Sequence, residues 1–171
     1  AEKYASEVIA QKNLTPRNEY LEMFCDPQEV GEEAIYRLNG FDQTNSLNSM
    51  FDYLSPDARP ASGLLAKFAD DDIRKQLFSY SYSGTDYPNV MLKYTCTADV
   101  KSDEDRYYNL SVFRLSEMYL IRAEARCALG ILDGAESDLK ALIARATGRN
   151  ASEIDLAWST ANELDSLINE E

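Results

Sequence analysis

Three consecutive carboxylates, Asp70, Asp71 and Asp72, form the group in this sequence that most directly suggests metal chemistry. Carboxylate oxygens are the ligands that Ca²⁺ prefers, so an acidic loop is a candidate calcium site. The EF-hand pattern also needs a glycine at the sixth loop position and a bidentate glutamate further on, and neither is present. The sequence therefore favours a helix terminus or turn in which one aspartate pairs with Arg74.

Other chemistry is limited by what the chain lacks. It contains no histidine, the commonest general base and the commonest metal ligand, which excludes catalytic triads and zinc sites in their usual form. Its cysteines, Cys25, Cys96 and Cys127, form neither an even set nor a metal-ligand spacing. Cys127 lies within a predicted core helix and is interpreted as a small buried hydrophobic residue.

The composition is that of a soluble globular chain with a strong negative charge. The formal net charge of -13 disfavours binding to nucleic acid or to anionic membrane surfaces, because both carry the same sign of charge. No apolar run is long enough to cross a membrane, and no signal peptide opens the sequence. The first and last residues fall inside helical patterns, so we expect the chain to be part of something longer.

The strongest structural pattern is a helical hairpin over residues 112–148. Apolar positions repeat at helical spacing, and Gly130 and Gly148 follow the ends of two helices. Asp133 and Glu136 suggest an acidic capping box for the second helix. Small side chains would let the two helices approach closely: Ala125, Ala128 and Ala135. The first helix is predicted to present the row Leu115, Met118, Arg122, Ala125 and Leu129, flanked by a second row, Ile121, Ala128 and Leu132.

Charged residues lie within the same helix: Arg114, Glu117, Arg122 and Glu124. A functional interpretation would make them a buried site, but their spacing lets them pair along the helix or with neighbouring elements. We therefore expect them to stabilise the scaffold.

The rest of the chain divides by pattern around this hairpin. The sequence predicts a single domain, or a fragment of one, with a helix within 1–16, a loop-rich insertion with short strands over 17–111, the core hairpin over 112–148 and a truncated C-terminal helix over 149–171. Within the insertion, 33–38 is a possible strand, 39–63 is loop, and 77–82 with 90–97 are expected to form a β-hairpin. Thr160 and Glu163 predict a capping box for the last helix, with Trp158 as a hydrophobic staple.

The run Arg114–Ala125 (RLSEMYLIRAEA), with Gly130 and Ala135 after it, closely resembles the signature helix pair of the SusD/RagB family of outer-membrane nutrient-binding lipoproteins. Weaker support comes from the AEKYASEVI helix and from the segment ending in Asp72 and Arg74. The resemblance implies a mainly α fold, with tetratricopeptide-like helical hairpins, long irregular insertions and a short β-hairpin. It also implies that the chain is a middle or C-terminal fragment of a larger SusD-like domain.

The function implied by this resemblance is non-catalytic. It is the capture of an oligosaccharide or another nutrient at the bacterial outer-membrane surface, with delivery to a SusC-type TonB-dependent transporter and membrane attachment only through a lipid anchor. Such a site needs aromatic faces on which sugar rings stack, with no cofactor. The aromatics available on non-helical segments are Tyr53, Tyr80, Tyr82 and Tyr87. The alternative for each is packing over the core with its hydroxyl reaching water.

Two other classes of function stay open. A tetratricopeptide-like protein–protein interaction module would share the same helix pattern, but it leaves the long loops unexplained because 39–105 shows no repeat of about 34 residues. A glycosidase would need two carboxylates at a fixed separation, and no motif selects a pair among the thirty acidic residues.

Overall fold

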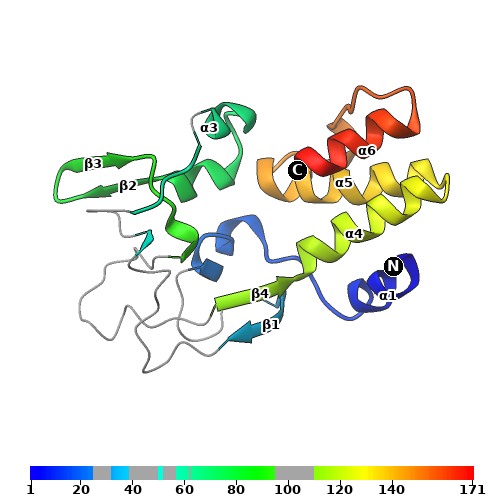
Figure 1. Ribbon diagram of the computed structural model, residues 1–171, viewed down its shortest axis with the longest axis horizontal. Helices are drawn as coiled ribbons and strands as arrows, with labels where there is room; N and C mark the ends of the chain where they lie inside the picture. The colour runs from blue at the N-terminus through cyan, green and yellow to red at the C-terminus, as the bar shows by residue number, and fades with distance from the viewer. Residues whose placement is uncertain (25–31, 39–49, 52–56, 62, 95–109) are drawn as a thin grey trace. The chain divides into compact units, whose positions relative to one another are not determined.

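The computed structural model describes residues 1–24, 32–38, 50–51, 57–61, 63–94 and 110–171 (Figure 1). The chain divides into two compact units. The helical unit comprises 1–14, 32–35 and 113–171, and the mixed unit comprises 15–31 and 36–112. Most of the loop predicted over 39–63 and all of the charged loop predicted over 101–105 lie outside the described residues.

The helical unit is built on the predicted hairpin, α4 (Leu115–Ala128) and α5 (Leu132–Thr147). Helices α1 (Glu2–Ile9) and α6 (Ala161–Glu170) both lie against α4 (Figure 1). The fold is therefore mainly α, with a tetratricopeptide-like helical hairpin, as the sequence predicts.

Helix ends follow the expected punctuation in most places. Gly130 and Gly148 both adopt φ +76°, a conformation that favours glycine and ends a helix. Thr160 and Glu163 form the predicted capping box of α6. The capping box expected at Asp133 and Glu136 is absent, because α5 begins at Leu132 with Ile131 at its N-cap and no side-chain cap. Asp133 is therefore already the second residue of the helix and does not stand at its N-cap.

The core of the helical unit lies between α4, α5 and α6. Its buried residues are Ala123, Cys127, Ala135, Leu139, Leu164 and Ile168, with Trp158 packed against them. The predicted burial of Cys127 and Ala135 is confirmed. The predicted apolar row is wrong at its end, since Leu129 is 66% exposed and Ala128 is also exposed. The contact face is rotated toward Ala123, because α4 packs against α1, α5 and α6 and its apolar rows cover more than one side.

A two-stranded sheet pairs β1 (Ala34–Leu38) with β4 (Leu110–Arg114). The strand expected over 33–38 is present, whereas Val112–Arg114, predicted as part of the helical hairpin, is strand. The carbonyl of Glu33 accepts from Leu115 N at 2.8 Å, and its carboxylate accepts from Ser116 N at 3.3 Å. Arg145 donates to the same carboxylate at 2.8 Å, so one buried acid holds the start of α4 and one end of α5.

The described part of the mixed unit includes the short helix α3 (Leu64–Lys67), several 3₁₀ turns and a β-hairpin. The hairpin pairs β2 (Ser79–Tyr82) with β3 (Thr85–Pro88). The second strand predicted over 90–97 is wrong where it is described, since Leu92–Tyr94 forms a 3₁₀ turn. Ser83 and Gly84 have φ of 51° and 79°, as in a two-residue type I′ turn, so the partner strand must begin at Thr85.

Candidate functional site

The β2–β3 hairpin brings two of the four predicted site residues together. Tyr80 lies directly opposite Tyr87 in the antiparallel register, and their ring centroids are 6.5 Å apart with an interplanar angle of 30°. Aromatic pairs across neighbouring strands stabilise a sheet and present a continuous apolar surface. We name Tyr80 and Tyr87 the tyrosine pair.

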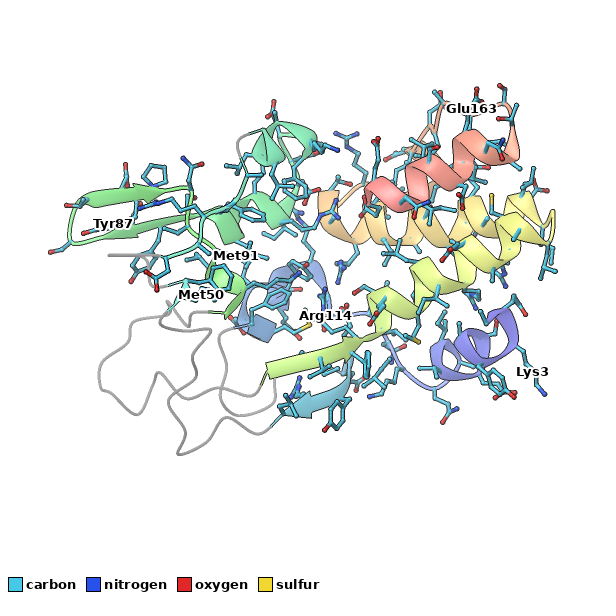
Figure 2. The ribbon with its side chains drawn as sticks, viewed as in Figure 1. Lys3, Met50, Tyr87, Met91, Arg114 and Glu163 are labelled. Carbon is cyan, nitrogen blue, oxygen red and sulfur yellow. The ribbon has the colours of Figure 1, made fainter. Side chains whose placement is uncertain are left out.

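The tyrosine pair is supported from below by an aromatic and aliphatic cluster. Both rings are partly buried and pack against a core comprising Tyr20, Met23, Phe24, Leu77, Val90 and Leu92. Val90 N donates to Phe78 O at 3.2 Å and closes the base of the hairpin. The hairpin therefore holds the two rings in fixed positions, with part of each ring accessible. Figure 2 labels Tyr87 on this hairpin.

The side chains of the other two predicted site residues lie outside the described part of the structure. Tyr53 lies outside the described residues. The backbone of Tyr82 pairs with Thr85 in β2–β3, and its side chain is not among those described. The sequence pattern does not predict that Tyr87 faces Tyr80. The predicted strands, 77–82 and 90–97, leave Tyr87 in the turn between them. The short turn at Ser83 and Gly84 is the signal that would have found it.

Charged side chains lie over other rings of the mixed unit. The Arg74 guanidinium is 5.1 Å from the Phe68 ring centroid, and Phe68 stacks on Phe78 at 5.6 Å. The Lys93 ammonium is 5.5 Å from the centroid of Phe24. Cation–π contacts of this kind order long side chains near apolar surface.

The acidic run at Asp70–Asp72 is a charged turn. Arg74 Nη2 donates to Asp72 Oδ2 at 2.7 Å, and Asp72 also caps the following 3₁₀ helix, so the predicted pairing with Arg74 is confirmed. Lys75 donates to Asp70 at 2.8 Å, and this hydrogen bond and charge hold the pKa of Asp70 below its ordinary value. Within the described residues, no group of three or more acidic, cysteine or histidine residues is arranged to hold a metal ion.

Of the four charged residues expected to stabilise the scaffold, Arg114, at the end of β4, and Arg122, in α4, form ion pairs as predicted. Glu117 and Glu124 are exposed and take part in no ion pair found among the described residues, so the expectation is not met for them. Arg122 and Arg126 both donate to Asp138 on α5, which is 3% exposed. Arg126 also reaches Glu2 of α1 at 3.4 Å, so two acids and two arginines link three helices. Arg114 lies 3.8 Å from Glu33.

Comparison with known proteins agrees with this architecture. A family model described as the SusD family matches residues 36–171. No curated protein matches the chain. Among solved structures, a SusD superfamily protein from Bacteroides vulgatus ATCC 8482 is similar over 100% of this chain and 41% of its own, with 24% identity and a TM-score of 0.73.

Two further solved structures are similar to nearly the whole chain. A SusD-like carbohydrate binding protein from Bacteroides vulgatus ATCC 8482 shares 21% identity over 99% of this chain and 37% of its own, with a TM-score of 0.72. A SusD superfamily protein from Bacteroides thetaiotaomicron VPI-5482 shares 18% identity over 99% of this chain and 42% of its own, with a TM-score of 0.68. The chain thus spans about two fifths of the length of these structures, and the likeness establishes its fold. Of the helices in the described ranges, none combines the length and apolar character of a membrane span.

Proposed function

Because the chain belongs to the SusD family, we propose that it forms part of a non-catalytic protein that binds an oligosaccharide or related nutrient. A solved structure similar to the chain is a SusD-like carbohydrate binding protein, which supports this class of ligand. We further propose that the whole protein is held by a lipid anchor at the bacterial outer-membrane surface and passes its ligand to a SusC-type TonB-dependent transporter.

The tyrosine pair is the observation that carries the binding proposal. A sugar ring has an apolar face of C–H groups that stacks on an aromatic ring, while its hydroxyls find polar partners at the edge. Tyr80 and Tyr87 present two rings tilted by 30° on a rigid hairpin, which suits contact with one or two neighbouring sugar units. We propose Tyr53 and Tyr82 as further contact residues on the same aromatic-rich segments.

A tetratricopeptide-like interaction module is the second candidate. The close packing of α4 and α5 through the fully buried Ala123 and Ala135 favours it. In that case the hairpin would serve only packing, and glycans would not bind. The two proposals therefore differ in whether the tyrosine pair contacts a glycan.

Affinity electrophoresis through gels containing a panel of neutral and acidic polysaccharides tests the binding proposal. The full-length parent protein should be retarded by at least one glycan. Retardation should weaken in Tyr87→Leu, which keeps apolar volume but removes the ring. The matched control is Tyr4→Leu, because Tyr4 is 70% exposed on α1, outside the hairpin. Absence of retardation by every glycan, or equal loss in both variants, would contradict the proposal.

A further inference from the structure

A groove of about 320 Å³ lies between α4 and α6, within the helical unit and apart from the tyrosine pair. Six residues line it, and we call the small or apolar ones, Cys127, Ala128 and Ala161, its floor and the polar ones, Glu124, Asn162 and Asp165, its rim. Both helices contact each other directly, and the residues that line the groove come from the last turns of α4 and the first turns of α6. The groove is therefore a surface feature built by two helices, and it does not depend on a loop.

The Cys127 thiol in the floor of the groove is unreactive. Cys127 Sγ lies 3.1 Å from Ala161 O and donates to it. Burial, with the Asp165 carboxylate as a lesser contributor, raises the pKa of this thiol, so it stays protonated. The floor therefore offers apolar surface to an occupant and no nucleophile.

The rim carries negative charge that the described part of the chain leaves without an ion pair. Ion pairs within this unit engage Glu33, Asp138 and Glu136, while Glu124 and Asp165 take part in none of those found among the described residues. Asn169 approaches Asp165 Oδ2 at 3.4 Å, which is a neutral contact. Two carboxylates thus face the groove with their charge uncompensated by any described base.

The backbone adds to the negative electrostatic potential of the groove. The last turn of α4 lines the groove, and the C-terminal end of a helix carries a partial negative charge. The opposing N-terminal end of α6 would favour an anion, but Glu163 already occupies it, accepting from Ser159 N at 2.7 Å and Thr160 N at 3.1 Å. Figure 2 labels Glu163 on α6. The segment 150–171 contains no lysine or arginine and has these acids: Glu153, Asp155, Glu163, Asp165, Glu170 and Glu171.

We propose that this groove receives a lysine or arginine side chain from a protein partner. The aliphatic stem of such a side chain fits over Ala128 and Ala161, and its cationic head lies between Glu124 and Asp165. Long basic side chains bury their stems on apolar surface in this way while the charge stays near water. Charge complementarity selects the occupant, because an anionic or purely apolar segment would leave both carboxylates desolvated without compensation.

Amide chemical-shift mapping of the ¹⁵N-labelled chain tests the groove with a defined probe. The probe is a blocked pentapeptide with lysine between glycines, and its partner peptide carries norleucine in place of lysine. The lysine peptide should shift signals of Glu124, Ala128, Asn162 and Asp165 saturably, and the norleucine peptide should not. Raising the salt concentration should weaken the effect, since the rim is open to solvent.

Variants distinguish binding of the lysine peptide in the groove from its attraction to the acidic surface as a whole. Glu124→Gln combined with Asp165→Asn should weaken binding of the lysine peptide by about tenfold. The control is Glu170→Gln, which removes an acid from the same helix outside the groove and should change binding by less than about twofold. If the double variant melts at a lower temperature, Glu124→Gln alone, at an exposed position, provides the comparison.

Three results would overturn the proposal. Equal shifts with the norleucine peptide would show that charge plays no part. An equal loss in Glu170→Gln would show attraction to the acidic surface as a whole. Stronger and saturable shifts of the same residues by Mg²⁺ or spermine would make a small cation the occupant in place of a protein side chain.

Discussion

Arg122 and Asp138 meet across the α4–α5 hairpin in a two-pronged ion pair. Arg122 Nη2 lies 2.6 Å from one carboxylate oxygen of Asp138 and Nε lies 2.9 Å from the other. Arg126 adds a third donor at 2.9 Å. The carboxylate is almost fully buried, so its charge is tolerable only because these guanidinium groups surround it.

Replacing this acid should strongly destabilise the helical unit. Asp138→Asn leaves the largely buried Arg122 without its anion and Arg126 with Glu2 alone, and we expect a loss of about 3 kcal/mol in the free energy of unfolding. Urea unfolding followed by circular dichroism measures it. The control is Glu136→Gln on the same helix, which breaks a more exposed pair with Lys140 and should cost less than about 1 kcal/mol. Equal effects of the two substitutions would contradict a structural role for Asp138.

The close helix contact at Ala123 gives a second prediction. Ala123 is fully buried against its neighbours, so Ala123→Leu should lower the free energy of unfolding by about 1–3 kcal/mol through overpacking. Ala128→Leu, at an exposed position one turn later, should have little effect on the thermal melt. A smaller loss for Ala123→Leu than for Ala128→Leu would place the helix contact on the other face.

The capping box of α6 predicts a loss of stability at a surface position. The Thr160 hydroxyl accepts from Glu163 N at 3.3 Å, and without it a first-turn amide loses its partner. Thr160→Ala should lower the free energy of unfolding by about 1 kcal/mol, measured by urea denaturation, and Thr160→Ser should retain most of the stability. Equal stability of both variants would mean that the cap contributes nothing.

Glu163 should make part of this stability depend on pH. Hydrogen bonds, first from the Ser159 hydroxyl and then from the Ser159 and Thr160 amides, hold the pKa of Glu163 below its ordinary value. Since the folded-state pKa is the lower one, the contribution is fully present above about pH 5.5 and is lost as pH falls through the folded-state value. The stability difference between the parent and Glu163→Gln should shrink in this acidic range, as urea titrations at several pH values would show. A difference that is constant down to about pH 3 would contradict it.

The tyrosine pair predicts separable effects on folding and on binding. Tyr87→Phe keeps the ring and should retain both the melting temperature and glycan retardation. Tyr87→Leu keeps packing volume but should reduce glycan retardation severalfold, with a smaller change in melting temperature. Isothermal titration with the best-retained glycan measures the affinity, and thermal melting measures the fold. Equal affinity of Phe and Leu variants would assign the pair to packing alone.

Much of the helical architecture follows from local sequence. The glycines at 130 and 148 and the Thr160 capping box act within one helical turn, so their positions can be recognised without the fold. The exposure of Leu129 and the burial of Ala123 were missed because α4 is apolar on more than one side. Which side becomes the core depends on where α1, α5 and α6 lie, and no local pattern contains that information.

The candidate site was predicted only in part, for a related reason. Tyr80 was placed on a strand correctly, but its partner depends on the register that Ser83 and Gly84 impose. The Lys93 ammonium lies over the ring of Phe24, a residue far from it in the sequence, so this contact is tertiary and no local pattern predicts it. The acidic groove likewise joins two helices whose contact the sequence does not specify.

The buried Glu33 has a consequence for the order in which the chain folds. Its bond to Arg145 joins residues separated by 112 positions, whereas α4 and α5 are joined by a turn of a few residues. Closing the longer loop carries the greater entropic cost, so the local hairpin should form early and the Glu33 contact late. During synthesis, the Glu33 carboxylate lacks its Arg145 partner until that residue has left the ribosome. Glu33→Gln should therefore speed unfolding while leaving the folding rate nearly unchanged.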